Sequence, residues 1–204
     1  NNTLTYYGAL SHYGEDIPLA CVGVISKVNI LMLGFTLGIS QGCQPIFSYN
    51  YGARQYSRVR EAYRKAIVAA SVICCIAFVC FQLFPRPIVA LFDPSGSEEY
   101  FQFAERYFRI YMFMTLANAF QPITANFFTS IGKAKRGALI ALTRQVIFLI
   151  PLILIFPLFL GIDGVMYAGP IADSAAVVVA LALVTREMKR MPHVDEPVAA
   201  DTPV

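Results

Sequence analysis

The 204-residue sequence has little charge and no tryptophan. Charged residues make up 14% of the chain and hydrophobic residues 57%, whereas soluble domains carry about 25% charged residues. A chain this apolar has too few polar side chains to cover a water-facing surface, which excludes an ordinary soluble domain. Without tryptophan, an aromatic belt at a membrane interface would depend on the 11 tyrosines.

Residues of catalytic and metal-binding type are also scarce. The two histidines, His12 and His193, have no catalytic partners nearby, and the five cysteines form no CxxC pair and no zinc-ligand spacing. The sequence has no phosphate-binding Gly-Lys-Ser/Thr loop, no His-Glu-x-x-His motif and no nucleophile elbow. We therefore predict no enzyme, no metal site and no cofactor. The cysteines are expected to be small buried residues of membrane helices.

Long apolar runs are what the sequence has instead. A membrane-spanning helix needs about 20 mostly apolar residues, and five segments qualify: 28–50, 63–84, 107–131, 137–160 and 164–185. The apolar stretch 1–13 is shorter, and the chain begins without Met or a signal-peptide pattern, so we expect a truncated first helix there. The predicted fold is an all-α membrane domain over residues 1–190, followed by a polar, proline-containing, disordered tail at 191–204.

The connections between these runs alternate in charge. Eleven of the 16 basic residues lie in 54–65, 133–136 and 186–190, whereas 14–16, 93–105 and the turn at Asp163 are acidic. Cytoplasmic loops retain Lys and Arg, so the basic connections and the C-terminal tail are predicted to be cytoplasmic. Topology and anionic headgroups explain the basic segment 54–65, so we expect membrane lipid, and no nucleic acid, as a partner.

Seven residues inside the spans are candidates for lining a cavity or binding a substrate or ion: Gln41, Gln44, Asn118, Gln121, Asn126, Arg144 and Asp173. A carboxylate in hydrocarbon is costly unless it is paired or wet, so Asp173 is expected to face the interior, in a functional or a structural role. The alternatives for Arg144 are anchoring at the interface and a cavity role or pairing with Asp173.

Small residues and prolines mark other positions in the spans. Glycines at 34, 38 and 42 share one helix face, which either packs against a neighbouring helix or lines a polar cavity. Three prolines, Pro45, Pro122 and Pro151, are predicted to kink their helices, because proline removes one backbone hydrogen bond. In lipid, the carbonyl freed in this way needs another partner.

The segment 38–53, GISQGCQPIFSYNYGA, resembles the second half of transporters of the multidrug and toxic compound extrusion (MATE) family. In that half a helix ends in a Gly-x-x-Gln-Pro-x-x-x-Tyr-Asn-x-Gly-Ala pattern. Further similar motifs follow in the same order: SRVR at 57–60, SIGK at 130–133, TRQ at 143–145, IPL at 150–152, DGV at 163–165 and GPIAD at 169–173. The similarity extends over nearly all of residues 1–190.

The resemblance implies one six-helix lobe of a twelve-helix MATE-type transporter, with its first helix truncated and the N-terminal lobe as a missing partner. It implies a secondary active antiporter of the bacterial plasma membrane that exports small organic, cationic drugs or toxic compounds by alternating access. Protons or sodium ions would drive export. Residues 110–131 lack the carboxylate that some members carry, so the coupling ion stays open. A lipid-linked saccharide flippase of the same superfamily and a non-transporting membrane fragment remain alternatives.

Overall fold

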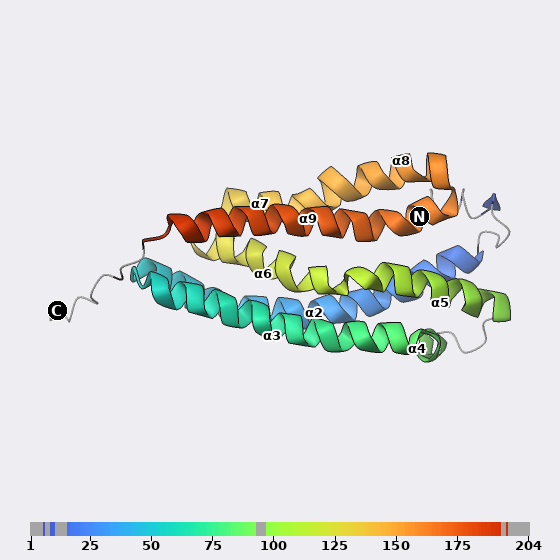
Figure 1. Ribbon diagram of the computed structural model, residues 1–204, viewed down its shortest axis with the longest axis horizontal. Coiled ribbons are helices and arrows are strands. Elements are labelled where there is room, and N and C mark those ends of the chain that lie inside the picture. The colour runs from blue at the N-terminus through green and yellow to red at the C-terminus, as the bar shows by residue number, and fades with distance from the viewer. Residues whose placement is uncertain (1–5, 7–8, 11–15, 93–96, 193–194, 196–204) are drawn as a thin grey trace.

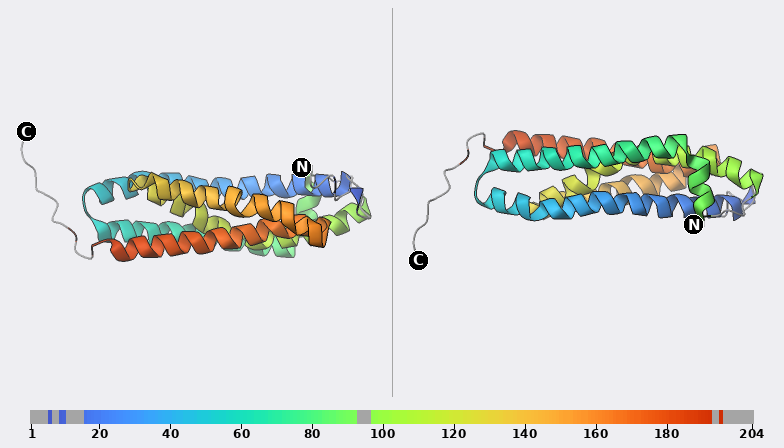
Figure 2. Two further views of the ribbon diagram at one scale, coloured as in Figure 1. Left: turned by 90° about the horizontal axis from the view of Figure 1, so that it is seen from above. Right: turned by 90° about the horizontal axis from the view of Figure 1, so that it is seen from below.

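The computed structural model describes residues 6, 9–10, 16–92, 97–192 and 195 (Figure 1). In chain order the elements are α2 (Asp16–Gly52), α3 (Tyr56–Leu83), α4 (Pro85–Phe92), α5 (Glu98–Met112), η1 (Phe113–Leu116), α6 (Ala117–Ser130), α7 (Ala134–Leu142), η2 (Thr143–Leu149), α8 (Ile150–Leu160) and α9 (Ile162–Arg190). The element η1 is a 3₁₀ turn and η2 is a π-helix. The long helices run side by side along the bundle (Figures 1 and 2), which confirms the all-α prediction.

Four helical stretches are long and apolar enough to cross a membrane: Asp16–Gly52, Tyr56–Leu83, Ala134–Leu160 and Ile162–Arg190. They contain the predicted spans 28–50, 137–160 and 164–185 and all but the last residue of 63–84. The first begins twelve residues before its predicted start, because residues 16–27 continue the helix and bury Cys21, Val24 and Ile25. Lys27 marked a boundary in the sequence, yet its side chain lies on the exposed side of the same helix.

The predicted span 107–131 is divided into α5, η1 and α6. Helix α5 begins at Glu98, nine residues earlier than predicted, and Ser97 caps it by accepting a hydrogen bond from the Tyr100 amide at 3.2 Å. Charged residues in α5 concealed a helix whose other face is buried. The 3₁₀ turn is held by the Thr115 hydroxyl, which donates to the Met112 carbonyl at 2.6 Å.

Helix α4 lies across the end of the bundle and is seen end-on in Figure 1. It was not predicted, because it has only eight residues and two of them are proline. Val89 is buried against the bundle while Leu91 is 81% exposed. A short helix of this kind at the end of a membrane bundle suits an interfacial position.

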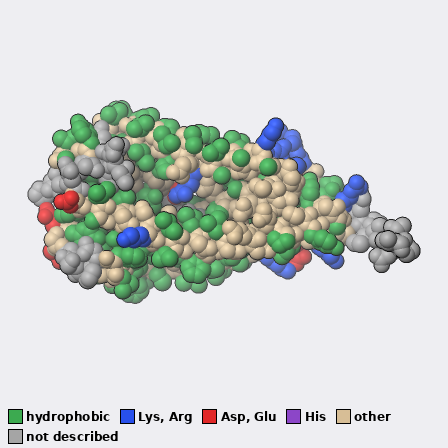
Figure 3. Space-filling model, turned by 180° about the vertical axis from the view of Figure 1, so that it is seen from behind, with side chains coloured by type: hydrophobic (Ala, Val, Ile, Leu, Met, Phe, Trp, Pro, Cys, Tyr) green, Lys and Arg blue, Asp and Glu red, His purple; other side chains and the backbone are tan. Residues whose placement is uncertain are grey.

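The alternating charges of the sequence become a separation in space. Figure 3 shows basic side chains at the end from which the tail leaves and acidic side chains at the opposite end. Two basic residues at the acidic end are paired, Arg86 with Glu98 at 2.6 Å and with Glu105 at 3.7 Å, and Arg106 with Asp163 at 3.9 Å. The pairing of these two arginines lowers the uncompensated positive charge at the acidic end.

The run α5–η1–α6 is the centre of the bundle, between α2 and α3 on one side and α7 to α9 on the other (Figure 1). Two apolar clusters fill the interior. Phe103, Tyr107 and Phe108 belong to the cluster at the acidic end, and Phe47 and Phe127 to the cluster at the basic end. Large apolar side chains also point outward, as expected for surfaces in contact with lipid.

The three predicted kink sites differ from one another. Pro45 and Pro122 lie inside helices that continue on both sides, so neither proline ends its helix. Pro151 stands in the first turn of α8, directly after the π-helix. Because Pro151 has no amide hydrogen to donate, regular α-helical bonding is interrupted here, which agrees with an irregularity at this position.

The tail predicted to be disordered begins with ordered residues. Met191 is 4% exposed and belongs to the apolar cluster at the basic end. The carbonyls of Met191 and Pro192 accept hydrogen bonds from Arg60, and Asp195 is bound by Ser57. The prediction of disorder is therefore wrong for these three residues, because burial and hydrogen bonds hold them. Residues 193–194 and 196–204 lie outside the described part, as do most of residues 1–13.

One glycine fixes the contact between α6 and α7. A methyl group on Gly137 would lie 2.6 Å from Thr129 Oγ1 and 2.7 Å from the Ala125 carbonyl. We expect Gly137→Ala to destabilise the purified protein by about 1–3 kcal/mol through overpacking. Gly38→Ala is the matched control, because its added methyl group meets nothing within 4 Å. Thermal unfolding in detergent that shows equal midpoints for both variants would contradict the prediction.

Candidate functional site

An ion pair inside the membrane region joins the π-helix to α9. Arg144 Nε donates to Asp173 Oδ1, and Arg144 Nη2 lies 3.4 Å from Asp173 Oδ2. The side chains are 18% and 8% exposed. Either charge alone would be costly in hydrocarbon. Of the alternatives that the sequence left open, the structure therefore shows Arg144 and Asp173 as partners.

A tyrosine from α5 packs beside this pair. A methyl group on Gly169 would lie 2.7 Å from Tyr111 Cε2, so the ring rests against the α9 backbone one turn before Asp173. Only glycine leaves room for this contact. Three elements, α5, η2 and α9, therefore meet around the buried charges.

The π-helix holds Arg144 in its second position. A π-turn carries an extra residue per turn and often occurs at functional sites. Pro151 is the signal in the sequence that accompanies it, since proline leaves a carbonyl of the preceding turn without its usual donor. The irregular turn lies in the spanning stretch that supplies the arginine.

Two of the predicted cavity residues on α6 are bonded to neighbouring helices. Asn126 Nδ2 donates to Ser40 Oγ at 2.7 Å, which ties α6 to α2. Gln121 Nε2 donates to the Ile140 carbonyl at 3.1 Å, which ties α6 to α7. The proposed polar row on one broad face of α6 is therefore not an open wall. Asn118 lies in α6, but its side chain is outside those described.

The predicted residues on α2 behave differently. Gln41 is exposed, Gln44 is half-buried and Pro45 is exposed. Methyl groups added at Gly34, Gly38 or Gly42 would meet nothing within 4 Å. Packing inside this bundle thus does not explain the glycines, which leaves a cavity or another protein surface as the reason for them. We call this exposed face, centred on Gly34, Gly38, Gln41 and Pro45, the glycine face of α2.

Several interhelical bonds were not predicted from the sequence. The buried Ser40 hydroxyl donates to the Pro122 carbonyl at 3.2 Å, and the Ser48 hydroxyl donates to the Ser130 carbonyl at 3.1 Å. The Tyr63 and Thr124 hydroxyls lie 2.8 Å apart. Serine and threonine are common in membrane helices, so no sequence signal distinguished these partners.

A buried carboxylate organises the basic end. Glu187 on α9 is 2% exposed and binds both Lys133 and Arg136 at the start of α7. Nothing in the sequence singles this residue out, because it stands among exposed basic residues of a helix end. The two cations offset the cost of burying one carboxylate, and the contact joins α9 to the α6–α7 connection.

The C-terminal segment supplies a cap for α3. Gln55, the residue before the helix, makes no side-chain cap. Asp195 takes this role by accepting hydrogen bonds from the Ser57 hydroxyl and, at 2.9 Å, from the Ser57 amide. These bonds favour the carboxylate and lower the pKa of Asp195 below its usual range.

Within the described part of the chain, no three or more His, Cys, Asp or Glu side chains form a cluster able to hold a metal ion. The chemistry of the site is therefore that of paired charges, amides and hydroxyls between helices. Together with the four apolar spanning stretches and the charged ends, it defines an α-helical integral membrane protein.

The comparison with protein families agrees and is more specific. The MatE family model matches residues 4–155, so the chain belongs to the MatE family. Members of this family are transporters, which confirms the expectation that the protein is not an enzyme. The family match also confirms the resemblance drawn from the motifs at 38–53 and beyond.

Two relatives are multidrug export proteins named MepA. The protein from Staphylococcus aureus (strain bovine RF122 / ET3-1) is 23% identical over 175 residues, and the one from Staphylococcus haemolyticus is 24% identical. Each match covers 86% of this chain and 38% of the relative. The chain thus spans less than half the length of these relatives.

Solved structures give the same picture. The MATE multidrug transporter DinF-BH, in a complex with a bound drug, is 33% identical, with a TM-score of 0.75 over 81% of this chain and 37% of that chain. Outward-facing and inward-facing structures of a MATE family transporter each give 0.82 at 19% identity, over 93% of this chain and 42% and 43% of theirs. The fold is that of one lobe of such transporters.

Breaking the buried pair tests its energetic role. Asp173→Asn would leave Arg144 buried without its counter-charge, and we expect a loss of about 3–5 kcal/mol in the free energy of unfolding. Arg144→Gln combined with Asp173→Asn removes both charges and should recover part of that loss. A double-mutant cycle from denaturant unfolding measures the coupling, and additive single effects would show that the pair contributes little.

The cap at α3 predicts a pH dependence. Because the pKa of Asp195 is lowered in the folded protein, its contribution is present above the usual pKa of an aspartate and is lost as pH falls through the lowered value. At neutral pH, Asp195→Ala should speed hydrogen exchange in the first turn of α3. The exposed Glu99 offers the control Glu99→Ala at the opposite end, which should leave that turn unchanged. Equal exchange in both variants would exclude the cap.

Proposed function

We propose that this chain is the C-terminal lobe of a secondary active transporter that exports small organic, cationic drugs or toxic compounds. Its MepA relatives are named multidrug export proteins, and the DinF-BH structure holds a bound drug. An N-terminal six-helix lobe would complete the transporter, since the chain covers about two fifths of its relatives.

The glycine face of α2 is the observation that carries the proposal. It lies in a spanning helix, it combines glycines with Gln41, and the described part of the lobe does not cover it. Polar groups in a membrane helix normally face protein or a watery cavity. We infer that this face lines the central cavity, opposite the partner lobe.

Alternating access is the mechanism we propose. Outward-facing and inward-facing structures of a family transporter both match this lobe with the same TM-score of 0.82. A lobe that fits both states supports movement of two lobes as rigid bodies around the cavity. Binding of the driving ion must differ in strength between the two states, or it would shift nothing.

We propose a proton or a sodium ion as the coupling ion. Asp173 is bound to Arg144 in this conformation, so we do not assign it as the ion's ligand; its role in the exchange is to hold η2 against α9. We also propose that the basic end and the C-terminus are cytoplasmic, in keeping with the retention of Lys and Arg on that side, and that the membrane is the bacterial plasma membrane.

A transport assay tests the function. The complete transporter polypeptide containing this chain would be reconstituted in liposomes, and ethidium export would be followed under an imposed proton or sodium gradient. Gly38→Leu should slow export by about tenfold or more, because added bulk costs about 1–3 kcal/mol where surfaces must meet. Ala141→Leu, at an exposed position of α7, should stay within about twofold of wild type.

Each outcome of this assay has a clear meaning. No export of ethidium or other organic cations under either gradient would refute the proposed function. Equal slowing by Gly38→Leu and Ala141→Leu would refute the assignment of the cavity to the glycine face of α2. A saccharide flippase would instead move an anionic lipid-linked substrate, which the same liposomes can report with a labelled lipid.

A further inference from the structure

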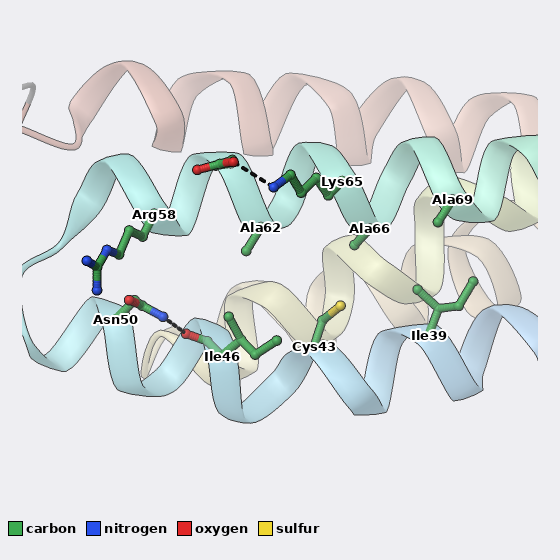
Figure 4. A pocket seen from close by; sticks show the side chains of 10 residues that line it. Ile39, Cys43, Ile46, Asn50, Arg58, Ala62, Lys65, Ala66 and Ala69 are labelled. Atoms are coloured by element: carbon green, nitrogen blue, oxygen red, sulfur yellow. Dashed lines mark hydrogen bonds and ion pairs between the residues drawn. The ribbon is translucent and has the colours of Figure 1, made fainter.

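A groove of about 550 Å³ runs between α2 and α3 at the basic end (Figure 4). Ten residues line it: Ile39, Cys43, Ile46, Asn50, Arg58, Glu61, Ala62, Lys65, Ala66 and Ala69. The groove lies beside the glycine face of α2, on the side toward α3. The interhelical contacts described above do not use this groove.

The lining is divided along the groove by polarity. Arg58 and Asn50 lie together at the end nearest the α2–α3 connection, whereas Ile39 and Ala69 lie at the far end (Figure 4). Asn50 and Ile39 are eleven residues apart on one helix, which corresponds to about 16 Å at 1.5 Å per residue. Half of a bilayer's hydrocarbon core is about 15 Å thick. The groove therefore extends from the interface to about the middle of the bilayer.

The charges at the polar end favour an anion. Lys65 is paired with Glu61 at 2.7 Å, so these two side chains largely offset each other. Arg58 is exposed and forms no hydrogen bond or ion pair within the described residues. Asn50 Nδ2 donates to the Ile46 carbonyl at 2.8 Å, which leaves its second amide hydrogen available at the same end. One guanidinium and one amide can thus donate to a single phosphate.

We propose that this groove binds one anionic phospholipid from the leaflet at the basic end. The phosphate lies at Arg58 and Asn50, and one acyl chain lies along Ile39, Cys43 and Ala69. A free phosphate would use only the polar end, whereas the length and the apolar far end fit a lipid that carries both parts. The inference does not depend on the transported substrate.

Lipid binding can be measured on the complete transporter polypeptide by native mass spectrometry in detergent. Dioleoylphosphatidylglycerol should bind more tightly than dioleoylphosphatidylcholine. Arg58→Gln should weaken phosphatidylglycerol binding by about fivefold, the effect expected for one basic residue at a membrane surface. Arg58→Lys, which keeps the charge, should retain most of the binding and also tests whether the site tolerates substitution without misfolding.

Two further variants separate a specific groove from general electrostatic attraction. Arg64→Gln removes an equally exposed charge from the same helix outside this groove and should leave binding nearly unchanged. Ala69→Phe alters no charge but fills the apolar end, and should weaken binding as much as Arg58→Gln. A phosphatidylglycerol with a photoreactive acyl chain should crosslink to residues 39–43 and 66–69.

Three results would overturn the proposal. Equal losses in Arg58→Gln and Arg64→Gln would indicate diffuse attraction of anionic lipid. Competition by glycerol 3-phosphate as strong as that by the lipid would indicate a soluble phosphate site. Crosslinks from the groove to another segment of the transporter, in place of lipid, would show that protein covers it. Ethidium export by the same preparations would report the proposed function separately.

Discussion

Hydrocarbon cannot hydrogen-bond, and this constraint governs the whole bundle. Every polar group inside the spans must find a partner in the protein or in enclosed water. The structure meets the constraint by bonds between helices: Arg144 with Asp173, Asn126 with Ser40, and Gln121 with the Ile140 carbonyl. Each of these bonds joins a different pair of elements. The polar residues thus specify which helices are neighbours, while apolar packing supplies most of the contact area.

Composition and charge predicted the class and the ends of the bundle, because both depend only on order along the chain. Apolar length gives the spans, and charges mark the connections whatever the packing. Helix limits were less well predicted. Lys27 and the charged side of α5 looked like boundaries, since a charge beside an apolar run ordinarily marks the membrane surface. Both lie on exposed sides of continuous helices, which requires knowledge of helix rotation.

The partners of the candidate residues depended on that same rotation. The sequence offered Asp173 as a partner of Arg144 only as an alternative to anchoring, because 29 residues and a turn separate them. Gln121 and Asn126 are on one broad face of α6, yet their amides reach opposite neighbours. Glu187 and Ser40 were missed altogether. A residue's type shows that it needs a partner, and only the fold shows which one.

The distribution of satisfied and unsatisfied surfaces argues for how such a lobe works. The interhelical polar groups are paired, and Glu187 and Asp195 extend that pairing to the basic end. A bundle tied in this way resists internal rearrangement, so a change of state costs least when the whole lobe moves. The glycine face of α2 has no such ties. Glycines let another surface approach closely without fixing it there, because they offer neither bulk nor side-chain bonds. The rigid interior and the bare α2 face are therefore complementary requirements of one sliding or rocking contact.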